Sequence, residues 1–267
     1  PDWITLELDL RGSWEDVVGR FRKSTRTTEV RKVRKYGLKY DVVKDRATIE
    51  HFYDTMYLPY VTRHFQDCVD VEDRDWLVGE AQKGGLIRVL RDGEFVAGGV
   101  LAYNSDHMEW LELGVSSVHA DSDRDIAISG LYYFTIKHAH EMGYQRLAAG
   151  LTRSFLGDGV YRYKRKWGAI VARTRYFKTS LLLDFDTESS AAREWLESSP
   201  FFEVHREGVR LNVFCFGEFD ADRIQRKLID RLSPGIAVIN IHSTEPPLEM
   251  PGEIGPCRVQ CQTLASA

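Results

Sequence analysis

The sequence predicts an α/β (α+β) fold in which a mixed, partly antiparallel sheet is flanked by helices. The segment Arg91-Asp92-Gly93 joins two apolar runs, and an Asp-Gly turn of this kind is typical of an antiparallel hairpin. A long apolar stripe at helical spacing follows between Ser122 and Gly143. Residues 143–171 then read as a strand, a loop, a short helix and a strand, a unit that directs its loop toward one edge of a sheet.

The N-terminal segment begins with a strand pattern and continues with helices. Apolar and polar residues alternate over Trp3–Leu10, which predicts a strand, and Ser13 followed by acidic residues predicts a helix N-cap. We expect this helix to run to about Tyr36 and to end at Gly37. The next expected elements are a strand at Lys39–Val43, a helix at Arg46–Phe65 and an acidic loop at residues 66–75.

The central segment carries the predicted sheet. Its expected elements are strands at Leu86–Leu90, Phe95–Tyr103 and Met108–Val115, a helix from the Ser122-x-x-Asp125 capping box to Gly143, a strand around residues 145–151, a helix at about residues 159–167 and a strand after Gly168. Strands and helices alternate too irregularly for a doubly wound sheet. An antiparallel first half with a helical crossover fits this order better.

The C-terminal segment is expected to be a loose extension. Its expected elements are a strand at Leu181–Phe185, a helix at Ser189–Glu197, a hairpin within Phe201–Phe216 and an amphipathic helix at Phe219–Leu232. After Pro246-Pro247 we expect a loosely ordered tail. The predicted domains are residues 1–85 with a strand and basic helices, residues 86–217 with the sheet, and residues 218–267 with the last helix and the tail.

Composition is that of an ordinary globular protein, with 43% hydrophobic and 28% charged residues and a net charge of −4. No apolar run approaches the roughly 18 residues of a membrane-spanning helix. The start, Pro1-Asp2-Trp3, lacks the basic residues of a signal peptide. We therefore expect a cytoplasmic protein, or a fragment whose start has been trimmed. The four cysteines are expected to be reduced thiols, with a disulfide between Cys257 and Cys261 as the alternative.

Two motifs, together with the element order, resemble a known family. Residues 150–168 read Gly-Leu-Thr-Arg-Ser-Phe-Leu-Gly-Asp-Gly-Val-Tyr-Arg-Tyr-Lys-Arg-Lys-Trp-Gly, a Gly-rich loop followed by an aromatic-Lys-x-x-aromatic-Gly run. Residues 22–40 form a basic helical segment upstream. These features are similar to those of the Fem-type transferases and their BioF2-like relatives in the GNAT superfamily, and the similarity covers about residues 10–185. The resemblance implies a GNAT-like fold and acyl transfer.

The chain departs from these relatives at two points. Fem-type proteins usually contain two such domains, and one is visible here. GNAT enzymes bind coenzyme A with a Gly-containing turn before the long helix, whereas residues 120–125 read Ala-Asp-Ser-Asp-Arg-Asp, and such an acidic turn repels a pyrophosphate. We expect no tightly bound cofactor. The acyl donor is acetyl- or acyl-coenzyme A, or an aminoacyl-tRNA.

Lys164 and Tyr163 are the candidate catalytic residues. The resemblance implies that this aromatic-Lys pair acts at the reaction centre, where the ammonium offsets the negative charge of an oxyanion or leaving oxygen. The alternative is a solvated basic face formed by Arg162, Lys164, Arg165 and Lys166. Replacement of Lys164 by alanine is expected to remove activity and to leave the melting temperature nearly unchanged.

Three neighbouring residues are candidates for binding the donor or the substrate. Arg153 could hold a phosphate or carboxylate in a bidentate contact, or form a salt bridge with Asp158. Asp158 is also expected to cap the short helix. Tyr161 completes this predicted binding set.

Glu109 and Glu112 lie on the predicted central strand, where GNAT enzymes sometimes place a base, and Glu112 is the selected candidate. Strict alternation puts Trp110 and Glu112 on one face of the strand, and Glu109 and Leu111 on the other. A carboxylate among apolar neighbours has a raised pKa, which suits base chemistry. The alternative is an exposed or paired glutamate.

The stripe from Arg20 to Lys35 contains eight basic residues among sixteen. Through Arg31 and Lys35 it could bind a tRNA backbone, a nucleotide-linked sugar or anionic lipid. The alternative is a solvated helix face balanced by the acidic loop at residues 67–75. No metal site is expected, because neither the histidines nor the aspartates of residues 121–125 have metal-ligand spacing.

These features predict an acyltransferase that moves an acyl or aminoacyl group onto an amine or hydroxyl of a small molecule or cell-envelope precursor. Direct attack on the donor is expected, because no Ser or Cys nucleophile motif is present. Charged tRNA is a candidate partner. The alternative is a non-catalytic GNAT-like binding module that docks an anionic partner through its basic helix.

Overall fold

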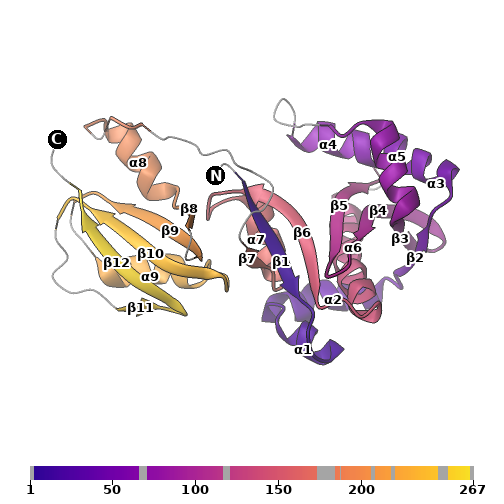
Figure 1. Cartoon of the computed structure of the whole chain (residues 1–267), viewed down its shortest axis with the longest axis horizontal. Helices are drawn as coiled ribbons and strands as arrows, with labels where there is room; N and C mark the ends of the chain where they lie inside the picture. Colours follow the sequence, from indigo (N-terminus) through magenta and orange to yellow (C-terminus); the bar gives the residue numbers. More distant parts are fainter. Residues whose placement is uncertain are drawn as a thin grey trace. The chain divides into compact units, whose positions relative to one another are not determined.

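A computed structural model describes residues 3–65, 71–116, 121–172, 184–186, 188–205, 208–217, 220–245 and 252–264. The chain forms two compact units (Figure 1). The first unit is Leu8–Gly150, and the second combines Pro1–Glu7 with Leu151–Ala267. The three domains expected from the sequence, with boundaries at residues 85/86 and 217/218, stay a prediction.

The first unit is built on a mixed sheet with the strand order β2-β3-β4-β5-β6. These strands are β2 (Lys39–Val43), β3 (Gly85–Arg91), β4 (Glu94–Tyr103), β5 (Met108–Val115) and β6 (Arg146–Arg153), whose last three residues belong to the second unit. Strands β2 to β5 pair antiparallel, and β6 pairs parallel with β5 after the crossover helix α6 (Asp121–Glu141). The predicted mixed sheet with an antiparallel first half is therefore confirmed.

The predicted hairpin turn is also confirmed. Asp92 and Gly93 have φ values of 52° and 88°, so both residues adopt the left-handed region that an Asp-Gly turn requires. Helix α6 likewise ends near the predicted glycine, since Gly143 has a φ of 83°. Its start differs from the prediction: the helix already includes Asp121, so Ser122 is not its N-cap residue.

The predicted single helix from Ser13 to Tyr36 is wrong. Ser13 does cap α1 (Trp14–Gly19), but this helix stops and the chain resumes as the π-helix η1 (Thr25–Glu29) and α2 (Val30–Lys35). The break follows from two local contacts. The guanidinium of Arg20 donates to the carbonyl of Arg11 at 2.9 Å, and Phe21 is buried against Trp14 with ring centroids 6.4 Å apart. Gly37, with a φ of 60°, ends the second helix as predicted.

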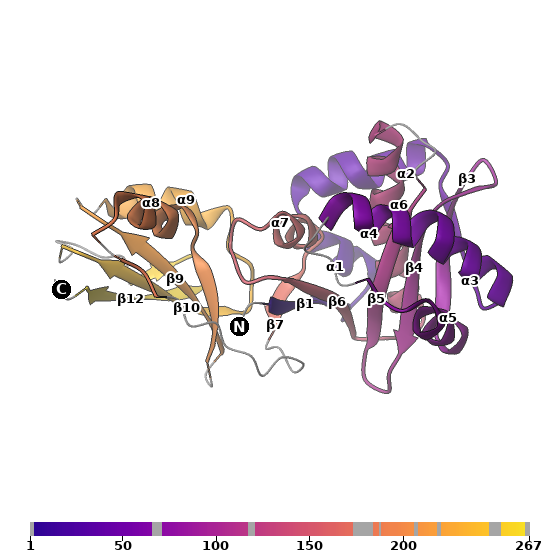
Figure 2. The same cartoon turned by 90° about the horizontal axis from the view of Figure 1, so that it is seen from above.

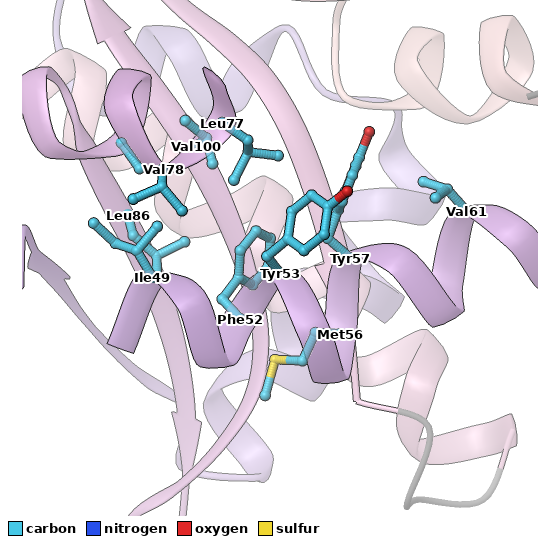
Figure 3. Packing of buried hydrophobic residues seen from close by; sticks show 11 residues of the cluster. Ile49, Phe52, Tyr53, Met56, Tyr57, Val61, Leu77, Val78, Leu86 and Val100 are labelled. Atoms are coloured by element: carbon cyan, nitrogen blue, oxygen red, sulfur yellow. The ribbon is translucent and has the colours of Figure 1, made fainter. Parts of the chain in front are cut away.

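One face of the sheet is covered by a run of helices around the cluster shown in Figure 3. The predicted helix at residues 46–65 is confirmed as α3 (Arg46–Phe52), the π-turn η2 (Tyr53–Tyr57) and α4 (Leu58–Phe65). A further helix, α5 (Arg74–Lys83), was not predicted. Its buried residues Leu77, Val78 and Ala81 join Phe52 and Tyr57 in the cluster.

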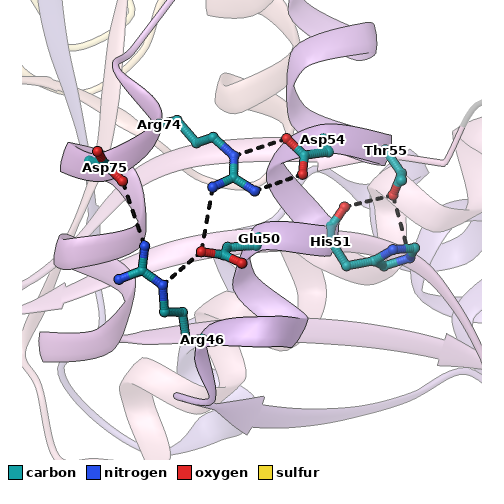
Figure 4. Close-up of polar contacts among 7 residues, drawn as sticks. All are labelled: Arg46, Glu50, His51, Asp54, Thr55, Arg74 and Asp75. Atoms are coloured by element: carbon teal, nitrogen blue, oxygen red, sulfur yellow. Dashed lines mark hydrogen bonds and ion pairs between the residues drawn. The ribbon is translucent and has the colours of Figure 1, made fainter.

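Ion pairs hold α3, η2 and α5 together on the outer side of these helices (Figure 4). Arg74 contacts Asp54 at 2.8 Å and Glu50 at 3.4 Å, while Arg46 contacts Glu50 at 2.7 Å and Asp75 at 3.7 Å. In the described part of the predicted acidic loop, Asp75 thus pairs with a residue of the neighbouring helix α3. Asp73 caps α5 by accepting from the amide of Trp76.

The opposite face of the sheet is covered by α6. The glycines of β4 show the two sides clearly, because a Cβ at Gly98 would meet the ring of Phe52, whereas one at Gly99 would meet Trp110. The Trp110 ring lies 4.7 Å from the ring of Tyr132 in α6. Each face of the sheet therefore has its own helical layer.

In the second unit, the end of β6 is followed in strand order by β1 (Trp3–Asp9) and β7 (Ile170–Ala172). Strands β1 and β7 pair antiparallel, with Leu6 opposite Val171. Helix α7 (Gly159–Lys166) connects β6 to β7, as the sequence predicts for residues 143–171. This part of the unit carries the candidate site.

The rest of the second unit is a five-stranded sheet with the order β11-β12-β10-β9-β8. Its elements are α8 (Ser190–Ser198), β8 (Phe201–His205), β9 (Gly208–Cys215), α9 (Ala221–Ile229), β10 (Ile236–Ser243), β11 (Glu253–Ile254) and β12 (Cys257–Thr263). The predicted helix at Ser189–Glu197, the antiparallel strand pair and the late helix are confirmed.

The loosely ordered tail is wrong for its described part. Strand β12 pairs parallel with β10 over six residue pairs, from Val238 opposite Arg258 to Ser243 opposite Thr263. Strands β10 and β12 were not predicted, and β12 is stabilised by its pairing with β10, which lies far from it in the sequence. Of the predicted strand at residues 181–185, residues 181–183 lie outside the described residues, and Asp184 and Phe185 are not in a strand.

No disulfide is formed among the cysteines of the described residues. Cys257 is fully buried and its thiol donates to the carbonyl of Ile236 at 3.3 Å, so the alternative of a disulfide with Cys261 is wrong. Among the helices of the described residues, none combines the length and the apolarity needed to cross a bilayer.

Candidate functional site

Helix α7 begins at Asp158, whose carboxylate accepts two hydrogen bonds. Oδ1 of Asp158 accepts a hydrogen bond from the amide of Tyr161 at 2.7 Å, which confirms Asp158 as the N-cap. The same oxygen accepts a short hydrogen bond from the hydroxyl of Thr152 in β6. The start of the helix is therefore tied directly to the end of the strand.

Lys164 is turned inward. Only 7% of its surface is exposed, and its Nζ donates to the carbonyl of Leu151 at 2.8 Å. Burial of an ammonium costs free energy unless hydrogen bonds compensate it, so a buried lysine at the end of a strand is an unusual feature. The alternative of one solvated basic face is wrong for this residue.

Arg165 is also engaged, in a structural role. Its guanidinium donates to the carbonyls of Leu232, at 2.9 Å, and Asp230. Tyr161 is fully buried and its hydroxyl donates to the carbonyl of Arg231 at 2.8 Å. Burial raises the pKa of Tyr161 to about 12. Tyr161 therefore anchors α7 to the residues after α9, and its role in substrate binding stays a prediction.

Tyr163 keeps a partly exposed position beside Lys164. The ammonium of Lys166 lies 3.8 Å from the centroid of the Tyr163 ring, close enough for a cation–π contact. Arg162 is exposed. The four basic residues of α7 thus occupy different environments, and Lys164 is the one that combines a charge with burial.

Arg153 stacks on an aromatic ring. Its guanidinium carbon lies 4.0 Å from the ring centroid of Trp3. The predicted alternative, a salt bridge with Asp158, is not formed among the described residues. A stacked guanidinium keeps its edge available for hydrogen bonds, so the predicted contact with a phosphate or carboxylate stays a prediction.

Neither packing nor backbone conformation requires glycine at the two positions that flank Asp158. A Cβ added at Gly157 or at Gly159 would find no atom within 4 Å, and neither residue has a positive φ. The loop therefore exposes bare backbone next to the start of α7. Close approach of a ligand to the backbone is a common reason for glycine at such a position.

In the first unit, a β-bulge in β5 changes the predicted faces. Val100 pairs with Glu112 but Leu101 pairs with Trp110, so Leu111 is an extra residue and the alternation shifts. Directly paired residues share a face of the sheet, which places Glu112 with Val100 on the side of η2 and Trp110 on the side of α6. The prediction that Trp110 and Glu112 share a face is wrong.

Glu112 lies near Tyr57 on this face. Burial first, and the charge of Glu112 second, raise the pKa of the Tyr57 hydroxyl. The helix comes very close to the strand here, because a Cβ at Gly114 would lie 2.6 Å from the amide nitrogen of Tyr57. The hydroxyl of Tyr57 also accepts a hydrogen bond from the amide of Glu72 at 3.1 Å.

Strands β5 and β6 pair only at their starts. Met108 lies opposite Leu147 and Glu109 opposite Ala148, and no pair follows along the rest of these two fully described strands. The edge of β5 beyond Glu109 is thus not paired with β6. Glu112 lies within this unpaired length.

The basic segment of η1 and α2 presents its charges to solvent. Arg31 and Lys35 are exposed, and neither forms an ion pair with any described residue. Within the described residues 71–75, Asp75 pairs with Arg46 (Figure 4), and Asp73 caps α5. Asp67 and Asp70 of the predicted acidic loop lie outside the described residues, so the alternative of a helix face balanced by this loop stays a prediction.

The predicted site residues fall into two groups. Arg153, Asp158, Tyr161, Tyr163 and Lys164 lie together around α7 in the second unit. Glu112, Arg31 and Lys35 lie in the first unit.

The sequence reading missed Thr152 and Trp3. A threonine six residues before an N-cap carries no recognisable signal, and the stacking of Trp3 on Arg153 depends on which strands are neighbours. No group of three or more metal-ligating side chains occurs in the described ranges.

Comparison with known proteins adds one informative likeness. No family model matches the sequence, and no curated protein matches it. The crystal structure of FemX superposes with a TM-score of 0.51 and 14% identity, covering 64% of this chain and 60% of that one. The chain shares the fold of FemX. It spans about three fifths of the FemX chain, and the likeness at this identity concerns the fold alone.

Two other solved structures are similar at lower scores. A protein of unknown function from Bacteroides thetaiotaomicron has a TM-score of 0.46 and 16% identity, over 62% of this chain and 55% of that one. The L-PGS structure from Bacillus licheniformis has a TM-score of 0.41 and 15% identity, over 56% and 46%. The predicted likeness to the fold of the Fem-type transferases is confirmed by the FemX structure.

Proposed function

We propose that this protein is an acyltransferase that moves an aminoacyl or acyl group onto an amine or hydroxyl of a small molecule or cell-envelope precursor. One observation carries the proposal: in a FemX-like fold, Lys164 of the aromatic-Lys motif is buried and held against the end of β6. A solvated lysine on a helix surface would have given no such support.

Lys164 is proposed to stabilise charge at the reaction centre. Attack on the donor carbonyl creates an oxyanion, and a fixed ammonium in a water-poor setting stabilises it more strongly than one in bulk water. The hydrogen bond to Leu151 fixes the ammonium, and the Thr152–Asp158–Tyr161 contacts fix the helix that carries it. Tyr163 is proposed to contact the reacting groups, and Arg153 to bind a phosphate or carboxylate.

Proton removal from the attacking amine or hydroxyl needs an acceptor. Glu112 remains the candidate, because it lies on the part of β5 that is not paired with β6 and faces the partly apolar layer around Tyr57. The proposed transfer is direct, with no covalent enzyme intermediate. The attacking amine or hydroxyl gives up its proton as the new bond to the acyl carbon forms, and the bond to the leaving group of the donor breaks.

An aminoacyl-tRNA is the donor that we favour over acyl-coenzyme A. The start of α6 carries Asp123 and Asp125, and an acidic helix start disfavours a bound pyrophosphate. The ion pair of Asp123 with Arg91, at 2.8 Å, neutralises only one of them. The exposed cations at Arg31 and Lys35 suit a polyanion instead.

Calorimetric titration tests the donor class. The protein is titrated with coenzyme A, acetyl-coenzyme A, bulk uncharged tRNA and tRNA charged with a mixture of amino acids. The proposal expects micromolar binding of tRNA and none of coenzyme A. Micromolar binding of acetyl-coenzyme A would overturn the donor assignment and leave acyl transfer in place, while binding of neither donor would contradict the proposed function.

A second candidate is a non-catalytic binding module that docks an anionic partner through η1 and α2. The acidic start of α6 favours this candidate. A GNAT-like domain that does not bind coenzyme A at this turn lacks the usual donor for catalysis. The two candidates separate cleanly. A module requires that Arg31→Glu with Lys35→Glu abolish partner binding while Lys164→Ala has no effect on any measured property except stability.

A further inference from the structure

A cavity of about 210 Å³ lies in the C-terminal part of the second unit, between α8, α9 and strand β9. Helices α8 and α9 lie on the same face of the five-stranded sheet, as Figures 1 and 2 show. The apolar wall of the cavity comes from Val213 on the strand and from Ile224 and Leu228 on α9. An engineered cavity of about 150 Å³ is large enough to hold benzene, so this one has room for an apolar group of several carbon atoms.

Two cations line the same cavity. Arg223 and Lys227 are four residues apart on α9 and therefore on one side of the helix. Lys227 donates one hydrogen bond, from Nζ to the carbonyl of Glu197 at 2.7 Å, which leaves two of its three N–H donors for other partners. Arg223 forms no ion pair with the described residues.

Glu197 supplies the one carboxylate among the lining residues, and this carboxylate already accepts a hydrogen bond. Oε1 of Glu197 accepts from the amide of Phe216 at 2.7 Å, which holds the side chain at the end of α8. Two cations against one such carboxylate leave the cavity with an excess of positive charge. Burial, and next the nearby Arg231, lower the pKa of Lys227, so an anion placed here would relieve an unfavourable charge.

Cys215 is part of the lining of the cavity. Its residue is 2% exposed, and burial raises the pKa of its thiol. The thiol is therefore a poor nucleophile and is not itself proposed as a reactive group. Its position in the lining makes it a reporter of occupancy.

We propose that this cavity binds a small organic anion, a carboxylate or phosphate that carries a short apolar group. The anionic group contacts Arg223 and Lys227, and the apolar group packs on Val213, Ile224 and Leu228. The site is independent of the proposed acyl transfer, because no residue of the lining belongs to the group around Lys164. Recognition by two cations and an apolar wall selects against neutral and cationic compounds of the same shape.

Methyl NMR on the whole chain tests the site. Resonances of Ile224, Leu228 and Val213 are followed during titration with isovalerate, isobutyl phosphate and the neutral isostere isovaleramide. We expect saturable shifts with at least one anion and none with the amide. Saturation by the carboxylate or by the phosphate alone identifies which anionic group is bound. Equal shifts with the amide, or no saturable shift with either anion, would overturn the proposal.

Matched variants assign the effect to the cations. Arg223→Gln and Lys227→Gln are each expected to weaken binding at least tenfold, whereas Arg226→Gln, an exposed cation of α9 outside the lining, should leave binding unchanged. Arg223 is exposed and its replacement leaves the Lys227–Glu197 contact intact, so this variant stays informative if Lys227→Gln proves unstable. Unchanged binding in Arg223→Gln would contradict the proposal.

Alkylation of Cys215 gives a second readout. Cys257 and Cys261 are first replaced by serine and valine, respectively, and Cys68 by serine, so that modification by iodoacetamide reports on Cys215. Bound anion is expected to slow this modification several-fold, and isovaleramide is expected to leave it unchanged. Equal modification rates with and without a saturating anion would count against occupancy of this cavity.

Discussion

The ammonium of Lys164 donates a hydrogen bond of 2.8 Å to the main-chain carbonyl of Leu151, which joins the last turn of α7 to the end of β6. A lysine that is 7% exposed has lost most of its water, so its charge acts on nearby groups with little screening. This contact gives the aromatic-Lys motif a physical meaning. It holds a positive charge at a fixed place beside a loop that exposes bare backbone.

Replacement of Lys164 by methionine tests the charge without opening a large cavity. We expect donor turnover to fall by about 10²- to 10³-fold, the size typical for loss of one preorganised oxyanion stabiliser. The free energy of unfolding should change by less than about 1.5 kcal/mol, because the lost hydrogen bond and the relieved burial of a charge offset each other. Turnover and urea unfolding are measured on the same preparation.

The matched control for this variant is Arg162→Met. Arg162 is an exposed cation of the same helix. Its loss should leave both turnover and stability within experimental error. A comparable loss of turnover in the two variants would show that α7 acts through its overall charge and not through Lys164.

Replacement of Asp158 by alanine should destabilise the second unit. The variant removes the acceptor for both the Tyr161 amide and the Thr152 hydroxyl, and loss of an N-cap costs about 1 kcal/mol, with a range of about 0.5–2 kcal/mol. Asp158→Asn keeps an acceptor oxygen and should recover most of this loss. Chemical denaturation of both variants checks the claim, and equal stabilities would contradict the capping role.

The glycines beside Asp158 separate stability from function. Because a Cβ at Gly157 or Gly159 meets no atom within 4 Å and neither φ is positive, alanine should stabilise the chain by about 0.4–1 kcal/mol at either position. If a ligand approaches this backbone, the same variants should bind the donor more weakly. Thermal melts and donor titrations are compared, and unchanged donor affinity in both variants would remove the loop from the proposed site.

The basic segment should show itself in the salt dependence of tRNA binding. Replacement of Arg31 and Lys35 by glutamine should lower the slope of log K against log salt concentration by roughly 2, since each phosphate contact contributes about 0.9. Lys83→Gln, on α5, is the control, because Lys83 is paired with Glu80 at 2.7 Å. An unchanged slope in the Arg31 and Lys35 variant would exclude this face as the polyanion site.

Asp9 should contribute to acid sensitivity. Its hydrogen bonds with Arg11 lower the pKa of Asp9 from 3.8 to about 2. The folded state therefore holds this proton less tightly than the unfolded state. The resulting stabilisation is complete above pH 3.8 and is lost as the pH falls through about 2.

Replacement of Asp9 by asparagine should remove this contribution. The variant should be less stable than the parent at neutral pH, and its stability should fall less steeply between pH 3.8 and about 2. Urea midpoints measured across this range check the prediction, with Glu15→Gln as the control at an exposed position. Parallel curves for Asp9→Asn and the parent would contradict it.

Much of the fold was predictable because local signals agreed with the tertiary structure. The Asp92-Gly93 turn, the Ser13 and Asp158 caps and the stops at Gly37, Gly143 and Gly168 each depend on a few neighbouring residues. These local signals delimited the strands and helices of the first unit, and its mixed sheet could be predicted from their order. The break after α1 was not predicted, because it depends on the contact between Arg20 and the carbonyl of Arg11, nine residues earlier, and on the burial of Phe21.

The parts that escaped prediction depend on long-range pairing. Strand β12 is stabilised by its parallel partner β10, and its own sequence alternates weakly. The face of Glu112 depends on a bulge that is set by pairing with β4. The candidate site shows the same limit. Its helix and cap could be predicted, whereas the inward direction of Lys164 could not be told from a solvated face.

Donor discharge in Lys164 variants is the measurement that tests the central claim most directly. The parent, Lys164→Met and Arg162→Met are each incubated with charged tRNA or acetyl-coenzyme A and a pool of small amines and alcohols, and release of uncharged tRNA or free thiol is followed. We predict that the parent and Arg162→Met discharge one donor class, and that Lys164→Met does so at least 100-fold more slowly. Discharge by Lys164→Met at the rate of the parent would contradict the account.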